Sequence, residues 1–462
     1  MSQHGQGTGR RTFLGRMLLA GGAAALGAGG LGTLARLARA GDRPEADERF
    51  YVFAYFSGGW DVLLGLDPRD PAVFDADSMD ATRIQPGYEL QRARDLALVR
   101  PSPDAAAEMV FGPYIGGLAA HWERLAVVRG MSMDTLTHEV GRRRFLTGRP
   151  PSGLLARGAS GSAWLAAQFP DGALMPNLSV GVESFNPDLP VEVSAVRVSN
   201  AADLVALLRR ADPTLDPALD PLVAMRLADD AACARAYGSP TLRAAESSRL
   251  RLRAVLEADV QVLFNFGAST PEMQALRARY GFTTDLGSPE AQAALAAQAI
   301  SSGVSRVVTL RATGGLDTHF DDWQTEHGPR QQRGFDAIAK LATHLAELPY
   351  KDTGESFLDR TTIVGFSEFM RTPLLNARGG RDHWLTNSCF ALGGKIRGNT
   401  VIGASSDVGM SPQAVDLATG RVDAGGAVIR PEHILRTLLV DAGLTDDAAD
   451  LRVPPIPALL RT

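Results

Sequence analysis

Acidic residues and histidines follow several predicted strands of this chain, and such side chains can bind metal ions or transfer protons. The segment LRATGGLDTHFDDW at 310–323 continues a β-branched run, passes two glycines and then reaches Asp317 and His319. Asp61 comes shortly after the apolar run FYVFAYF, and Glu368 comes after the run TTIVGF. The same order of a buried strand and then a polar side chain therefore recurs along the sequence.

Two further pairs extend this pattern. Thr137 and His138 follow the predicted strand LAVVRGM, and Asp382 and His383 precede another predicted strand at 388–393. Loops at the carboxyl ends of parallel strands meet at one edge of a sheet, where ligands bind. We therefore expect these side chains to converge although long stretches of sequence separate them.

The residue types favour one or two divalent ions, namely Zn²⁺, Mn²⁺ or Mg²⁺. Carboxylates with neutral imidazoles suit Zn²⁺ and Mn²⁺, whereas oxygen-only sets suit Mg²⁺. Two ions about 4 Å apart would clamp the attacking and leaving oxygens of an ester. A single strand-end acid is more often a helix cap or turn former, so the prediction depends on convergence. The predicted ligands are Asp61, Asp317, His319, Glu368, Asp382 and His383.

Other polar residues near these clusters could assist. His327 in WQTEHGP is close to Asp317 in sequence, so it could form a hydrogen bond to a metal ligand without binding the metal itself. The segment EVGRRRFLTGR at 139–149 brings arginines to the end of the second predicted strand. Their guanidinium groups could hold an anionic substrate, and a solvated basic face is an equally good interpretation. The arginines are Arg142, Arg143, Arg144 and Arg149.

Strands that alternate with helices predict an α/β fold with a mostly parallel, doubly wound sheet. Residues 49–462 would form one domain, and the Ala/Leu/Arg-rich stretch at about 200–302 would be a helical insertion or cap over the sheet. The predicted strands are 50–56, 125–131, 173–183, 191–199, 304–310, 361–366 and 388–393, and the principal helices are 331–348 and 431–444.

The first 40 residues have the features of an export signal. The motif RRTFL at 10–14, a Gly/Ala/Leu stretch and the small-residue pattern ARA at 38–40 resemble a twin-arginine signal. A linker at 41–48 would follow. We therefore expect a periplasmic or secreted protein that has the twin-arginine export machinery as a partner. An uncleaved membrane anchor is the alternative, but Gly and Ala make a weak span, and the mature chain should not cross a membrane.

The composition argues against nucleic-acid binding. The formal net charge is −5, and no basic stripe with interleaved aromatic residues occurs. The chain has two cysteines and no zinc-type CxxC motif. A disulfide would suit an oxidising compartment, but Cys389 lies in the apolar run SCFALGG. We therefore interpret Cys233 and Cys389 as small buried side chains.

Five motifs occur in the same order as in a bacterial family of exported proteins, domain of unknown function 1501, which this chain resembles. They are RRTFL, SGGWD, THEVGRRRFLTG, GGLDTH and FSEFMRTPLLNARGGRDHW, and they span most of the mature chain. That family is similar to the alkaline phosphatase-like superfamily, which implies a doubly wound α/β core and usually two metals at the strand ends. The resemblance implies that Asp61 is the first-strand ligand, that Asp317 and His319 bind one metal, and that His383 is the late histidine ligand.

Two departures from the superfamily pattern affect the expected chemistry. Glu368 is followed by Phe369 where the superfamily has an Asp-His pair, so either Asp382 compensates or one metal is lost. The superfamily nucleophile at a helix N-terminus corresponds to Thr137, with Thr135 as a second choice and a plain helix cap as the alternative role. The sulfatase motif C-x-P-x-R is absent, which excludes an ordinary formylglycine sulfatase.

The sequence thus predicts an exported metal-dependent hydrolase whose substrate is a small phosphate, sulfate or related anionic ester. Thr137 would attack the ester or orient the attacking hydroxide, and His138 would bind metal or stabilise the transition state. The alternative is a non-catalytic envelope or assembly protein that retains the hydrolase fold.

Overall fold

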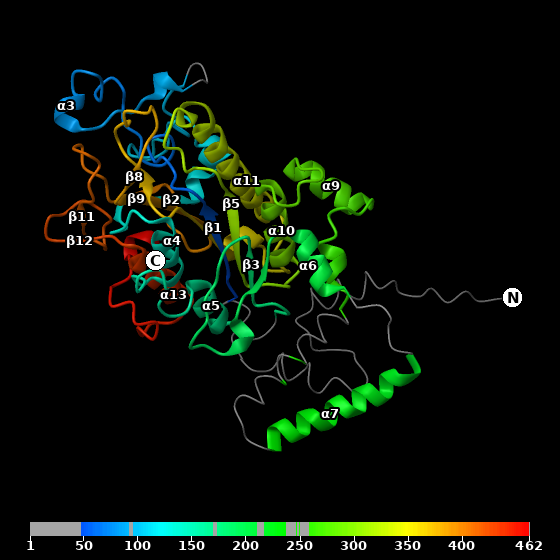
Figure 1. The fold of residues 1–462 in the computed structure, drawn as a ribbon. Coiled ribbons are helices and arrows are strands. Elements are labelled where there is room, and N and C mark those ends of the chain that lie inside the picture. Colours follow the sequence, from blue (N-terminus) through cyan, green and yellow to red (C-terminus); the bar gives the residue numbers. More distant parts are fainter. Residues whose placement is uncertain are drawn as a thin grey trace.

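The computed structural model describes residues 48–91, 96–169, 173–209, 217–236, 246, 249 and 258–461. The predicted export signal and all but the last residue of the predicted linker lie outside this range. The described residues form an α/β fold around one eight-stranded sheet (Figure 1). None of the helices in these residues is both long and apolar enough to cross a membrane.

The central sheet is mostly parallel, as the sequence predicts. Its strand order is β10-β2-β9-β6-β1-β5-β3-β4, and only the two pairings made by β9 are antiparallel. The strands are β1 (Phe50–Phe56), β2 (Leu125–Ser132), β3 (Asn177–Val180), β4 (Val196–Val198), β5 (Val307–Thr313), β6 (Thr361–Phe366), β9 (Thr386–Gly393) and β10 (Thr400–Ile402). Short two-stranded sheets pair β7 (Met370–Arg371) with β8 (His383–Trp384), and β11 (Ala414–Val415) with β12 (Ala427–Val428).

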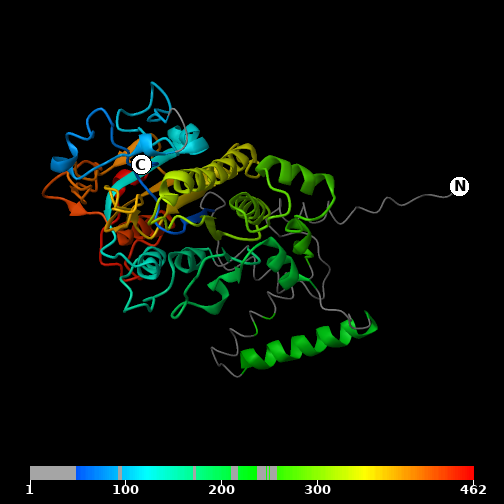
Figure 2. The ribbon, with the colours of Figure 1, turned by 45° about the horizontal axis from the view of Figure 1, so that its top comes forward.

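Helices cover both faces of the sheet (Figures 1 and 2). One face packs against α10 (Pro289–Ser301) and α11 (Gly328–Glu347). The other face packs against α4 (His138–Thr147), α5 (Gly161–Gln168) and α13 (Pro431–Asp441). The other described helices include α3 (Met79–Thr82), η3 (Gly116–Arg124), α6 (Ala201–Leu208), α9 (Pro271–Tyr280) and α12 (Phe357–Arg360).

The central strand β1 shows why this sheet needs two helical layers. All of its residues are buried, as expected for a parallel strand covered on both faces. Val52 and Ala54 belong to the core shared with α10 and α11, whereas Tyr51, Phe53 and Tyr55 belong to the core shared with α4 and α13. The continuous apolar run FYVFAYF therefore supplies both cores by simple alternation.

The helical stretch predicted at about 200–302 divides into two kinds of structure. Its last helix, α10, packs directly on β5 and α11 and is part of the core layer. By contrast, α7 (Asp220–Ala236) lies away from the sheet in both views (Figures 1 and 2). An insertion that stands apart from the core therefore ends before residue 289.

The two cysteines differ in burial, and both are free thiols. Cys389 is buried in β9, as the sequence predicts, and its burial raises the pKa of the thiol. Cys233 is exposed on α7, so the prediction of a buried side chain is wrong for this residue.

Candidate metal centre

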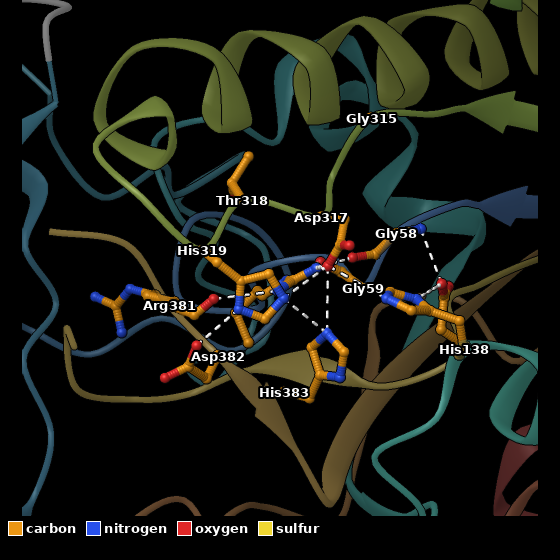
Figure 3. A network of polar contacts seen from close by, with 12 residues as sticks. Gly58, Gly59, His138, Gly315, Asp317, Thr318, His319, Arg381, Asp382 and His383 are labelled. Carbon is orange, nitrogen blue, oxygen red and sulfur yellow. Dashed lines mark hydrogen bonds and ion pairs between the residues drawn. The ribbon is translucent and has the colours of Figure 1, made fainter. Parts of the chain in front are cut away.

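Loops from several strands meet at one edge of the sheet. The carboxyl ends of β1, β2, β5 and β6 lie at this edge because these strands are parallel. Strand β9 runs in the opposite direction, so its amino end lies at the same edge and brings Asp382 and His383 with it. The topology therefore gathers residues that are far apart in the sequence (Figure 3).

Three histidines and one aspartate form the centre of this edge (Figure 3). Asp317 Oδ1 lies 3.2 Å from His138 Nε2, 3.0 Å from His319 Nε2 and 3.2 Å from His383 Nε2. The Nε2 atoms of His319 and His383 are 3.0 Å apart. The predicted convergence of Asp317, His319 and His383 is present, and His138 joins it. We call these four residues the centre.

The second nitrogen of each imidazole in the centre has an oxygen acceptor at 2.7 Å. The pairs are His138 Nδ1 with Glu368 Oε1, His319 Nδ1 with Asp382 Oδ1, and His383 Nδ1 with the Leu136 carbonyl. Carbonyl and carboxylate oxygens accept hydrogen bonds, so each Nδ1 carries a proton. In its neutral form, each ring then presents the lone pair of its Nε2 atom to the middle of the centre.

These facing lone pairs fit a divalent cation. Acceptor atoms about 3 Å apart repel one another unless a proton or a cation neutralises them. Bonds of about 2.0–2.1 Å around a tetrahedral Zn²⁺ imply ligand separations of about 3.3 Å, close to the four separations given above. Metal-binding histidines also usually donate their other ring nitrogen to a carboxylate or carbonyl. The donor set and its supporting acceptors both match a metal site.

The pKa values of Asp317 and His383 favour the forms that can bind a metal ion. Partial burial would raise the pKa of Asp317, but the hydrogen bond and charge of Arg371 outweigh it and hold this pKa well below its usual range. Burial lowers the pKa of His383. For His138, burial opposes the charged ring, but the contact with Glu368 prevails and raises the pKa. Asp317 is therefore ionised and His383 neutral at neutral pH.

Arg371 lies beside the centre as a fully buried cation. Its Nη2 atom is 2.5 Å from Asp317 Oδ1, and its Nη1 atom donates to His319 Nε2 at 3.4 Å. The other N–H groups of this guanidinium donate to the backbone carbonyls of Gly58, Gly59 and Arg381. All five donors of the side chain are used, so a positive charge is fixed next to Asp317.

Asp61 does not join the centre. Its Oδ1 atom accepts a hydrogen bond from the Leu63 amide, and its Oδ2 atom accepts one from Trp323 Nε1 at 2.8 Å. Arg381 Nε lies 3.1 Å from the same Oδ2 atom. Because buried donors already hold both oxygens, Asp61 braces the loop after β1 instead of facing the other predicted ligands.

Glu368 and Asp382 contact the Nδ1 atoms of His138 and His319, on the side of each ring that faces away from the centre. Glu368 Oε1 also accepts from the Gly58 amide at 2.9 Å, and its Oε2 atom accepts from the Ser367 hydroxyl at 2.9 Å. Asp382 Oδ1 also accepts from the side-chain amide of Asn376 at 3.1 Å. In this geometry the two carboxylates orient imidazoles, a different position from that of the direct ligands expected from the sequence.

His327 supports the loop that carries Asp317 and His319. It is buried, its Nε2 atom accepts from the Asp61 amide at 3.0 Å, and its Nδ1 atom lies 2.7 Å from the Thr318 hydroxyl. Burial holds the pKa of His327 well below its usual value, so the ring is neutral. Thr318 is thereby held in the interior between the two residues that face the centre.

Helix α4 brings His138 to the centre. Gly141 permits this approach, since a Cβ atom there would lie 2.2 Å from the Glu368 carbonyl oxygen. Thr137 occupies the N-cap position, but its side chain makes no capping hydrogen bond. The Thr137 side chain is exposed, so its hydroxyl stands open to solvent at the start of a helix next to the centre.

A comparison with protein families assigns this chain to a known group. A family model described as protein of unknown function (DUF1501) matches residues 52–420. The chain belongs to the DUF1501 family. The match includes all four residues of the centre and both supporting carboxylates. A comparison with curated proteins finds no match.

Two arginines of this DUF1501 chain were not expected at the site. Arg371 and Arg381 directly contact residues that the sequence did single out, Asp317 and Asp61. The only sequence feature that could have indicated these arginines is their closeness to predicted ligands. Arg371 follows Glu368 by three residues, and Arg381 directly precedes Asp382. Most arginines are solvated, so position alone does not indicate burial of the guanidinium group.

Gly58 is expected to be essential for the geometry of the centre. Its φ is +114°, and a Cβ atom there would lie 2.7 Å from the Asp317 backbone nitrogen. Gly58→Ala should therefore displace Asp317 and lower the Zn²⁺ affinity about tenfold or more in a chelator-competition titration. Gly153→Ala is the matched control, since φ is +57° there and nothing lies within 4 Å of its Cβ position. Equal affinities of the two variants would contradict this role.

Proposed function

We propose that this DUF1501 chain is an exported metal-dependent hydrolase of a phosphate, sulfate or related anionic ester, built on an alkaline phosphatase-like core. The observation that carries the proposal is the convergence of three imidazole Nε2 atoms on Asp317 Oδ1. This convergence occurs at the carboxyl edge of a mostly parallel sheet, where open α/β folds bind their ligands. The RRTFL motif at 10–14 supports the export part of the proposal.

We propose that the centre holds one divalent ion. His138, Asp317 and His383 offer ligand atoms within 4.8 Å of one another, and His319 Nε2 lies against two of these atoms. An imidazole-rich set favours Zn²⁺ or Mn²⁺ over Mg²⁺. The resembled superfamily usually has two metals, and in this chain the fixed guanidinium of Arg371 would supply a second positive charge beside the ion. When bound, the ion would polarise an oxygen of the phosphoryl or sulfuryl group.

The residues around the proposed ion would have separate roles in the reaction. Thr137 is the proposed nucleophile, because its hydroxyl is uncapped and the amides at the start of α4 favour negative charge there. Arg371 holds Asp317 ionised and in place. Glu368 keeps the proton of His138 on Nδ1, which leaves Nε2 free as a ligand. Asp317 has a side chain that is 49% exposed, so a substrate can reach the centre from solvent.

Turnover tests this proposal directly. The purified chain, loaded with Zn²⁺ or Mn²⁺, should hydrolyse an aryl phosphate, an aryl phosphodiester or an aryl sulfate. Asp317→Ala and Thr137→Ala should each lower kcat about 100-fold or more, whereas Thr137→Ser should retain most activity. Turnover that survives Asp317→Ala would show that the reaction occurs elsewhere.

Asp382 is expected to tune the metal affinity without touching the ion. Asp382→Ala removes the acceptor of His319 Nδ1 and should weaken Zn²⁺ binding about tenfold. Asp321→Ala is the matched control, since this exposed acid lies on the same loop as His319. Zn²⁺ titration of the two variants measures the difference. Similar affinities would mean that Asp382 does not position the ring.

A second candidate function is a non-catalytic envelope or assembly protein. One observation favours it, namely that Arg371 already neutralises Asp317 and donates to His319. The centre is therefore partly balanced without an ion. Stoichiometric metal with no turnover on any of the three ester classes would support this candidate over the hydrolase.

A further inference from the structure

A hollow of about 720 Å³ lies beside the centre, at the carboxyl ends of β1, β3, β4 and β5. Ser57 lines it and directly precedes Gly58, whose amide holds Glu368. Arg142 also lines it and stands four residues after His138 on α4, on the same helix face. The hollow and the centre are thus neighbours built from shared elements.

Strand register places two further arginines of this hollow on one face of the sheet. Tyr55 of β1 is opposite Arg311 of β5. Thr309, two residues earlier, is opposite Ser179 of β3, which is opposite Arg197 of β4. Residues in register, or two apart along a strand, share a face. Arg311 and Arg197 therefore lie on the face that carries Tyr55, where α4 and α5 also pack.

The positive charges of Arg197 and Arg311 are not paired with any acid among the described residues. Arg197 and Arg311 are exposed. Across the residues that the structure describes, no hydrogen bond or ion pair engages either guanidinium. A guanidinium left free in a hollow is a ready donor for an oxyanion, because its planar fork matches two oxygens at once.

The acids that line the hollow are already engaged. Glu183 Oε1 accepts from Arg142 at 3.1 Å and from Arg143 at 2.9 Å. Asp203 Oδ2 accepts from the Ser199 amide at 3.0 Å. Neither carboxylate pairs with Arg197 or Arg311, and the lining has three arginines against two acids, so its net charge is positive.

We propose that this hollow binds a second anionic group of the substrate, a phosphate, sulfate or carboxylate. Arg197 and Arg311 provide the charge, and the hydroxyls of Ser57 and Ser199 provide further hydrogen-bond donors. The part of this inference that concerns a substrate rests on the proposed hydrolase, with the cleaved ester at the centre. The preferred substrates are then esters with at least two anionic groups.

Calorimetric titration of the metal-free chain with inorganic sulfate tests the hollow by itself. The wild type should bind about one sulfate, and the double variant Arg197→Ala/Arg311→Ala should bind it at least about tenfold more weakly. The control Arg397→Ala/Arg421→Ala removes the same charge from exposed arginines outside the hollow and should bind like the wild type. No sulfate binding by the wild type, or equal binding by both double variants, would overturn the proposal.

A second measurement separates this proposal from the hydrolase. Asp317→Ala should lower kcat about 100-fold or more yet bind sulfate like the wild type, because Asp317 does not line the hollow. With metal loaded, Arg197→Ala/Arg311→Ala should raise KM several-fold for an aryl phosphate that carries a ring carboxylate. The same variant should leave KM for the unsubstituted aryl phosphate unchanged. Sulfate binding with an equal effect on both substrates would overturn the substrate role.

Discussion

Replacing His383 with alanine is expected to lower the Zn²⁺ affinity of the chain about 100-fold or more, because one of its proposed ligands is lost. The Nε2 atom of His383 lies 3.0 Å from that of His319 and 3.2 Å from Asp317 Oδ1, so its lone pair is central to the set. The acceptor left behind is the carbonyl of Leu136, an exposed residue that water can solvate. The fold should therefore survive, and competition with a chromophoric chelator measures the affinity.

His121→Ala is the matched control for this loss. This half-buried histidine lies at the opposite edge of the sheet, before β2, and its Nε2 atom is 3.1 Å from the Ala339 carbonyl. The control variant should bind Zn²⁺ like the wild type. If His383→Ala also kept the wild-type affinity, the convergence of imidazoles would have no role in metal binding.

Replacing Arg371 with methionine is expected to lower the free energy of unfolding by about 3–5 kcal/mol. The substitution keeps a long apolar stem but removes every donor of a buried guanidinium. The carbonyls of Gly58, Gly59 and Arg381 then lose their hydrogen bonds inside the protein. Unmet acceptors of this kind each cost about 1–3 kcal/mol. Urea unfolding of the metal-free chain measures the loss without any contribution from a bound ion.

Arg378→Met is the control for the loss of charge. The Arg378 side chain is 56% exposed and stacks on Phe320, with 4.4 Å between the guanidinium carbon and the ring centroid. Its replacement should change the free energy of unfolding by no more than about 0.5 kcal/mol. A loss below about 1 kcal/mol for Arg371→Met would show that Arg371 does not hold the strand-end loops together.

The sequence was a good guide to the sheet but not to every strand direction. The apolar runs of β1 and β6 predict buried strands, and the alternation with helices predicts parallel order. The antiparallel direction of β9 cannot be predicted from its sequence. A strand that is buried on both faces has the same continuous apolar pattern in either direction. That direction decides where His383 lies, because it puts the start of β9 at the sheet edge that carries the centre.

The sequence predicts which loops contribute to the site, but it does not predict which side chains face the centre. Asp317, His319 and His383 were expected to meet because each adjoins a strand at one sheet edge, and the structure brings them together. The separate position of Asp61 was not predictable, since it depends on Arg381, whose burial has no sequence signal. Strand-end position thus predicts which residues gather, whereas the packing of guanidinium groups decides which of them face the centre.

The most direct test of the account is the metal content of the purified chain, measured by elemental analysis after loading with Zn²⁺ and gel filtration. We expect one ion per chain in the wild type, bound through about three imidazoles and one carboxylate by X-ray absorption. Asp317→Ala and His383→Ala should both lose the ion. A wild-type chain that binds no divalent ion, or variants that retain it, would contradict the proposed centre.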